Sequence, residues 1–155
     1  MIQRIQTLYL LAGIIALIAC LLLPVGQYQP EGMGVGATLF NLMIQSGNPA
    51  LQLSIWQQSF PLFLCVFLAV LLALVAIFSY KTRKRQAKLC VGAIVCCLLW
   101  YVGVYFYGFY LCPIEWTFRP GIGICLPLLS TFFFYLARKG VLADERLVRE
   151  SNRLR

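Results

Sequence analysis

The sequence predicts an all-α membrane protein, a four-transmembrane-helix up-down bundle with both termini in the cytoplasm. Of its 155 residues, 61% are hydrophobic and only 12% are charged, whereas a soluble domain is about 45–50% apolar and about 25% charged. Four windows are long and apolar enough to cross a bilayer core of about 30 Å. This composition excludes a soluble globular domain and a disordered chain, so we expect residues 1–155 to form a single integral membrane domain.

The four windows cover residues 7–23, 60–80, 89–111 and 121–137, and none of them contains Asp, Glu, Lys, Arg or His. Each is a continuous apolar run rather than the alternating pattern of a membrane barrel strand, so each predicts a helix. Two outside loops (24–59 and 112–120), a cytoplasmic loop (81–88) and a cytoplasmic tail (138–155) then connect or follow them. A competing interpretation makes residues 1–20 a cleaved signal peptide with a lipobox-like end. The apolar run continues through Leu23, which favours an uncleaved anchor helix.

The basic residues predict the orientation. Twelve of the thirteen Lys and Arg residues lie before the first span, between the second and third, or after the fourth, and Arg119 alone lies on the opposite side. The positive-inside rule therefore predicts a multi-pass protein with an N-in/C-in topology. Five of the basic residues cluster in the cytoplasmic loop: Lys81, Arg83, Lys84, Arg85 and Lys88. This cluster either anchors the topology alone or also contacts acidic lipid headgroups, a partner or RNA.

Both outside loops carry local signals. In the first, Gly47, Asn48 and Pro49 predict a turn, and the flanking residues 39–44 and 51–56 would pair as a small β-hairpin. This hairpin is either a lid over the helix ends or a cap on which a partner docks. In the second, Pro120 would suit the first turn of the fourth helix, and Glu115 would pair with Arg119 only if the loop holds a helical turn.

Aromatic residues crowd the outer half of the third span and the loop after it. Tyrosine and tryptophan prefer the membrane interface, so one interpretation is an aromatic belt. The alternative is a groove for a quinone or a lipid tail, with candidate lining residues Trp100, Tyr101 and Tyr105.

The residue types argue against several activities. Without histidine, the chain cannot build a Ser-His-Asp or Cys-His site or a histidine-liganded metal site, and charge-free spans argue against a proton pump or an ion-coupled carrier. The seven cysteines contain no C-x-x-C pair, and most fall within spans, where cysteine behaves as a small hydrophobe. Cys112 and Cys125 both fall near the outer boundary, and a disulfide between them is an alternative that the sequence leaves open. We predict no catalytic residues, no metal site and no cofactor.

Small residues recur every four positions at Ala12, Ala16 and Cys20, at Ala69 and Ala73, and at Gly92 and Cys96. This spacing lets helices approach closely, either inside the bundle or against another membrane protein. In the fourth span, Pro127 would kink the helix or lie near its start, and Ser130 and Thr131 could bond a freed carbonyl. After it, Gly140 would break or bend the chain before a short cytoplasmic helix.

The first eleven residues, MIQRIQTLYLL, and the last thirteen, ADERLVRESNRLR, resemble the terminal signatures of an uncharacterised family. This family comprises small four-span inner-membrane proteins of Gram-negative bacteria and is known only as a domain of unknown function. Asn152 stands where an acidic residue is more usual. The resemblance implies a location in the bacterial inner membrane, and it supplies no activity, ligand or catalytic residue.

The function is therefore not specified by any motif. We expect a non-enzymatic accessory or scaffold subunit of an inner-membrane protein assembly. The alternative is a protein that binds or transports a small molecule, a quinone or a lipid. The expected partners are membrane lipids and other integral membrane proteins. We expect no nucleic acid, because insertion alone accounts for the placement of the positive charge.

Overall fold

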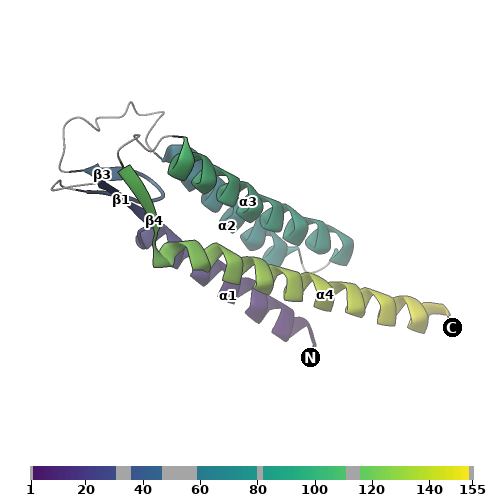
Figure 1. The fold of residues 1–155 in the computed structure, drawn as a ribbon. Helices are drawn as coiled ribbons and strands as arrows, with labels where there is room; N and C mark the ends of the chain where they lie inside the picture. The colour runs from purple at the N-terminus through teal and green to yellow at the C-terminus, as the bar shows by residue number, and fades with distance from the viewer. Residues whose placement is uncertain (1, 31–35, 47–58, 80–81, 111–115, 154–155) are drawn as a thin grey trace.

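The computed structural model describes residues 2–30, 36–46, 59–79, 82–110 and 116–153. The elements in chain order are α1 (Ile2–Leu22), β1 (Gly26–Pro30), β2 (Ala37–Leu39), β3 (Ile44–Ser46), α2 (Phe60–Phe78), α3 (Arg83–Phe109), β4 (Trp116–Pro120), the short 3-10 helix η2 (Ile122–Ile124) and α4 (Cys125–Arg153). The helices lie side by side, and the strands gather at one end of them (Figure 1).

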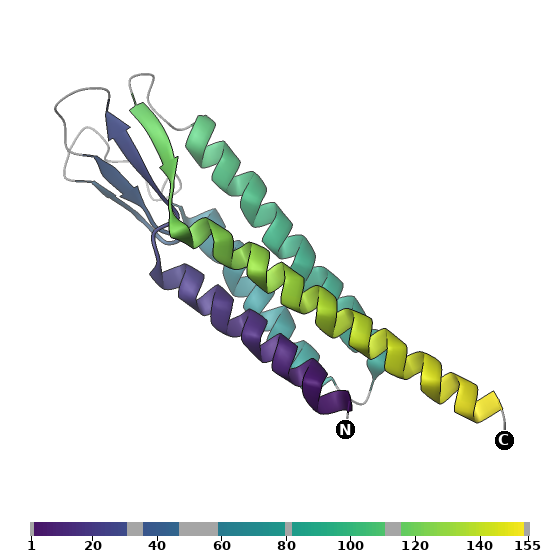
Figure 2. The same cartoon turned by 60° about the horizontal axis from the view of Figure 1, so that its bottom comes forward.

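The four helices run alternately in opposite directions. Figure 2 shows the strands at one end of the bundle and both chain termini at the other; these are called the sheet end and the terminal end below. Helix α1 packs mainly on α4, α2 packs mainly on α3, and α3 also packs on α4. The predicted set of four long helices is therefore observed, together with a small antiparallel sheet.

All four helices are long and apolar enough to cross a membrane, as the sequence predicted for four helices, and this is compatible with a multi-pass membrane protein. Their outer faces are apolar, since Leu8, Phe78 and Leu128 expose 63%, 77% and 65% of their surface. Such faces suit lipid rather than water, because only in lipid does exposing a large apolar side chain carry no hydrophobic cost.

Small residues let the helices approach inside the bundle. Ala69 and Ala73 of α2 are fully buried, and a Cβ on Gly103 of α3 would lie 2.7 Å from Cδ2 of Leu62. Between α1 and α4, a Cβ on Gly13 would lie 2.5 Å from Cε1 of the buried Phe134. Of the two uses proposed for the small-residue repeats, these contacts support packing within the bundle.

Helix α4 differs from the prediction because Gly140 does not end it. A glycine inside a helix costs only about 1 kcal/mol relative to alanine, and here close packing offsets that cost. A Cβ on Gly140 would lie 3.0 Å from Cγ of Gln6, which shows how near α1 runs. Gln6 also donates from Nε2 to Oδ2 of Asp144 at 2.7 Å. The separate short helix predicted after Gly140 is therefore wrong, and the tail is the last part of α4.

Helix α3 also begins earlier than predicted, at Arg83 rather than at residue 89. Arginine, lysine, glutamine and alanine are good helix formers, and both Gln86 and Ala87 are buried. Most of the predicted cytoplasmic loop is therefore the first turn and a half of α3.

The strands form one four-stranded antiparallel sheet in the order β3-β2-β1-β4. The predicted first hairpin strand, residues 39–44, is wrong, because β2 ends at Leu39 and β3 begins at Ile44. Phe40 donates its amide to the carbonyl of Met43 at 2.9 Å and closes the turn between them. The predicted second strand, residues 51–56, lies outside the described residues.

Strand β4 comes from the second outside loop and pairs with β1 along its whole length, from Gly26 opposite Pro120 to Pro30 opposite Trp116. Residues 116–119 are therefore extended rather than helical, which removes the condition for a pair between Glu115 and Arg119, and Glu115 lies outside the described residues. Pro120 ends β4 instead of opening the helix. A different proline, Pro127, lies near the start of α4.

The hydroxyls near Pro127 bond backbone carbonyls, but not the Gly123 carbonyl that the proline leaves without an N–H donor, so that part of the prediction is wrong. Thr131 Oγ1 donates to the Pro127 carbonyl at 2.8 Å, and Ser130 Oγ donates to the Leu126 carbonyl at 3.0 Å. Ser130 also lies 3.1 Å from the carbonyl of Gly13, so the same hydroxyl joins α4 to α1. In each case the hydroxyl shares a carbonyl of a helix, so the bond from Ser130 to Gly13 adds a link between α4 and α1.

Candidate functional site

The sheet presents a polar face on the side away from the bundle. The register aligns one residue from each strand in a row across the sheet: Gln45, Thr38, Gln27 and Arg119. Successive residues of a strand point to opposite faces, so Tyr28 and Phe118, the next residues along β1 and β4, face the helices. Their rings lie 5.2 Å apart, and Tyr28 is only 3% exposed.

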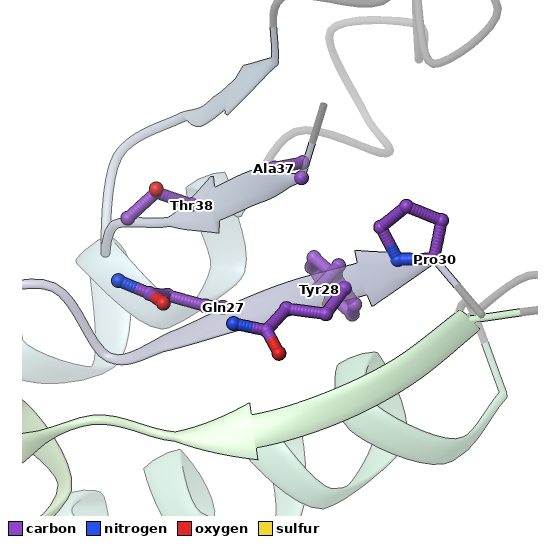
Figure 3. A pocket seen from close by; sticks show the side chains of 7 residues that line it. Gln27, Tyr28, Pro30, Ala37 and Thr38 are labelled. Carbon is purple, nitrogen blue, oxygen red and sulfur yellow. The ribbon is translucent and has the colours of Figure 1, made fainter. Parts of the chain in front are cut away.

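A pocket of about 370 Å³ opens over β1 and β2 on this polar face (Figure 3). Its lining residues are Gln27, Tyr28, Gln29, Pro30, Gly36, Ala37 and Thr38. Gln27 and Thr38 are cross-strand neighbours, and Gln29 lies two residues after Gln27 on the same face of β1. None of these lining residues carries a charge at neutral pH. We call this cavity the polar pocket.

A buried network fixes the sheet to the bundle, and Asn41 is its centre. Asn41 follows β2 and is fully buried. Its Nδ2 donates to the Cys20 carbonyl at 2.6 Å, and its Oδ1 accepts from Trp100 Nε1 at 2.7 Å. The carbonyl of Cys20 would bond the amide of residue 24 in a longer helix, but Pro24 has no N–H to give. Asn41 supplies that donor from the sheet.

A second proline creates a similar need at the start of α4. Pro127 has no N–H to donate to the carbonyl of Gly123. The Cys20 thiol donates to that oxygen instead, at a distance of 3.5 Å from Sγ. Two tyrosine hydroxyls make further links, since Tyr28 donates to the Tyr107 carbonyl at 3.0 Å and Tyr101 to the Ile124 carbonyl at 2.6 Å. The sheet and the helix ends therefore share one set of hydrogen bonds.

The three predicted groove residues occupy different surroundings. Trp100 is fully buried and donates to Asn41, and Tyr101 is half-buried with its ring edge-on to Trp100 at 5.1 Å. Tyr105 is 59% exposed and lies against Phe109, with ring centroids 4.6 Å apart. The structure thus joins Trp100 to Tyr101 in the bundle and turns Tyr105 outward.

The predicted basic cluster lies at the terminal end. Arg83, Lys84, Arg85 and Lys88 occupy the start of α3, and Lys81 lies outside the described residues. Lys84 Nζ is 3.8 Å from Glu145 Oε1 of α4, and the lysine side chain remains 75% exposed. An exposed pair of this kind contributes little stability. Arg85 and Lys88 are also exposed.

The cysteines of the described segments are free thiols. Cys125 is exposed at the first residue of α4, and Cys112, for which the sequence left a disulfide to Cys125 open, lies outside the described residues. Within the described part of the chain, no group of three His, Cys, Asp or Glu side chains could hold a metal ion.

An apolar groove of about 730 Å³ runs along α4 where it faces α3. Its lining residues are Ile94, Ile122, Cys125, Leu126, Leu128, Leu129, Thr131, Phe132 and Tyr135. Leu128, Phe132 and Tyr135 are each more than half exposed, so the groove opens on the outer surface of the bundle. We call it the α3–α4 groove.

Sequence reasoning missed β1, β4 and the role of Asn41. The signal for both strands is the alternation of outward polar and inward aromatic residues, in Gln27-Tyr28-Gln29 and in Trp116-Thr117-Phe118-Arg119. Each stretch is short and adjoins proline, which weakens a strand prediction. No local signal marks Asn41, because its partners are remote in the sequence.

The fold defines a class of protein: a four-helix bundle of membrane-spanning length with an antiparallel sheet across one end. The chain belongs to the family described as Domain of unknown function (DUF4293), whose sequence model matches residues 2–154. This confirms that the chain belongs to an uncharacterised family. No curated protein matches the chain.

Proposed function

We propose that the protein is a non-enzymatic accessory or scaffold subunit of a protein assembly in the bacterial inner membrane. The observation that carries the proposal is the closed interior of the bundle. Trp100, Phe134 and Leu17 fill it at zero exposure. Within the described segments, every buried side-chain nitrogen or oxygen has a hydrogen-bond partner. A satisfied, tightly packed interior suits an anchor and leaves no polar lining for transport.

The α3–α4 groove is the surface that we assign to the partner. It is apolar, it lies along a membrane-spanning helix, and its lining side chains project outward from α4. In lipid, helices associate through close packing rather than hydrophobic burial, so a concave apolar surface favours a fitting helix. The occupant we propose is a transmembrane helix of another integral membrane protein.

Site-specific photocrosslinking in native membranes tests this proposal. A photoreactive residue at Leu129, inside the groove, should give a discrete protein adduct that mass spectrometry identifies as one membrane protein. The matched control is Leu11, a leucine that is 48% exposed against 46% for Leu129 but lies on α1 outside the groove. Equal adducts from both positions, or recovery of a lone monodisperse chain after mild solubilisation, would overturn the scaffold role.

The same groove favours a second candidate function, the binding of a lipid tail or a quinone. Its lining is almost wholly apolar, and its volume falls within the range of about 300–1,000 Å³ typical of small-molecule sites. Under this alternative, the Leu129 photoprobe gives lipid or quinone adducts and no protein adduct. The crosslinking experiment therefore separates the two candidates directly.

We further propose that the sheet end faces away from the cytoplasm and the terminal end faces into it. The distribution of basic residues supports this orientation. Among the described residues, Arg119 is the one basic residue at the sheet end. Apart from Arg4 in α1, all the other described Lys and Arg residues lie at the start of α3 or in the second half of α4. The exposed Arg85 and Lys88 would then meet anionic lipid headgroups of the inner leaflet.

Labelling with a membrane-impermeant maleimide checks the orientation. We expect Thr117→Cys in β4 to gain one label over wild type in spheroplasts, because its side chain is exposed at the sheet end. Lys139→Cys, exposed at the terminal end, should gain its label only after lysis. The reverse pattern would invert the proposed topology.

A further inference from the structure

We propose that the polar pocket binds a neutral saccharide. The pocket belongs to the sheet and is separate from the α3–α4 groove, so the proposal goes beyond the scaffold role. It depends on the proposed orientation in one respect only, namely on which side of the membrane the pocket encounters the sugar. Three features carry it: the chemistry of the lining, the position on the sheet, and the rigidity of the support.

The lining matches hydroxyl groups. A carboxamide offers two N–H donors and a carbonyl acceptor, and a threonine hydroxyl is both donor and acceptor. Sugar hydroxyls likewise donate and accept. Gln27, Gln29 and Thr38 bring these groups together on one face, and no charged side chain lines the pocket to favour an ion. The ring of Pro30 adds a C–H surface on which a sugar ring can lie.

The position on the sheet argues against an extended peptide. Strand β1 pairs with both β2 and β4, and β2 pairs with both β1 and β3. From Gly26 to Tyr28, β1 therefore has a paired strand on both sides, and a peptide cannot add there as another strand. Recognition at this pocket must come from side chains. The volume of about 370 Å³ lies at the lower end of the range of about 300–1,000 Å³ for ligand sites, as a small ligand requires.

The support beneath the pocket is rigid. Tyr28, between the two glutamines, is held by its hydroxyl on the Tyr107 carbonyl. Just before β2 begins, a Cβ on Gly36 would lie 2.7 Å from the Tyr28 carbonyl oxygen, so the chain approaches β1 closely there. Among the described residues, the side chains of Gln27, Gln29 and Thr38 make no hydrogen bond to other parts of the chain. Because the strand backbone is already held, binding has to order only these side chains.

Binding of two uncharged disaccharides, maltose and N,N′-diacetylchitobiose, tests the proposal. The full chain is placed in lipid nanodiscs, because glucoside and maltoside detergents carry competing sugar headgroups. Saturation-transfer NMR and calorimetry then measure binding. We expect saturable binding of at least one disaccharide and a loss of about tenfold or more in Gln27→Ala, as for a hydrogen bond left unmade in a binding site.

A matched control lies on the same face. Gln45 has the same side chain and belongs to the same cross-strand row, but it lies outside the pocket, so Gln45→Ala should bind like wild type. Thr38→Val serves as a second variant, because valine is favoured in strands and only the hydroxyl is lost. It should also weaken binding while the thermal unfolding curve stays unchanged.

Three results would overturn the proposal: no saturable binding of either sugar, an equal loss in Gln45→Ala and Gln27→Ala, or tighter binding of a neutral dipeptide amide at the same site. All three are measured on the isolated protein. They are therefore independent of the crosslinking result, and failure of the sugar site leaves the scaffold proposal to its own test.

Discussion

Asn41→Ala is expected to lower the free energy of unfolding by about 2–6 kcal/mol, because two buried partners lose their hydrogen bonds and each such loss costs about 1–3 kcal/mol. The Trp100 indole N–H is left without its acceptor, and the Cys20 carbonyl without its donor. Neither group finds water, since both residues are fully buried. The sheet should loosen first, because Asn41 connects it to α1 and α3.

Unfolding of the full chain in mixed micelles, followed by circular dichroism, measures this loss, and hydrogen exchange of the β2 amides reports the loosening. Leu42→Ala is the matched control, since it truncates the next residue, which is half exposed. A double-mutant cycle with Trp100→Phe should give an interaction energy of about 0.5–3 kcal/mol. Equal stability of the Asn41 and Leu42 variants would contradict the role assigned to the network.

The four helices could be predicted because membrane insertion is a local property of the sequence. A run of about 20 apolar residues suffices for a span, whatever packs against it. The ends were harder to place. At Gly140 the helix continues because Gln6, from the other end of the chain, packs closely against this glycine, in the space that a larger side chain would need. A sequence pattern contains no information about that neighbour.

The sheet shows the same limit more strongly. Strand β4 pairs with β1, with Gln27 opposite Arg119. Pairings between such distant segments leave only weak signals in the local sequence. Trp100 illustrates the consequence for side chains. Its type and position predict the membrane interface, yet it is buried because Asn41 reaches its indole nitrogen from the sheet. A network of this kind is visible only once the fold brings its members together.

Gly13→Ala is expected to lower the free energy of unfolding by about 1–3 kcal/mol, the usual cost of overpacking a core. The added Cβ would lie 2.5 Å from Cε1 of Phe134, and this ring cannot move aside because Phe134 is fully buried. Helices α1 and α4 must then separate, which also stretches the bond from Ser130 to the Gly13 carbonyl. The gain in helix propensity, about 1 kcal/mol, offsets part of this cost.

Gly92→Ala is the matched control, because its Cβ would meet only Cδ1 of Leu72 at 3.2 Å, the far end of a flexible side chain. There the propensity gain should dominate, so the variant should be as stable as wild type or slightly more stable. Phe134→Leu should lose stability alone and recover part of the loss when combined with Gly13→Ala, because the smaller side chain vacates the space that Cβ needs. Additive losses in the double variant would show that Gly13 and Phe134 do not share the contact between α1 and α4.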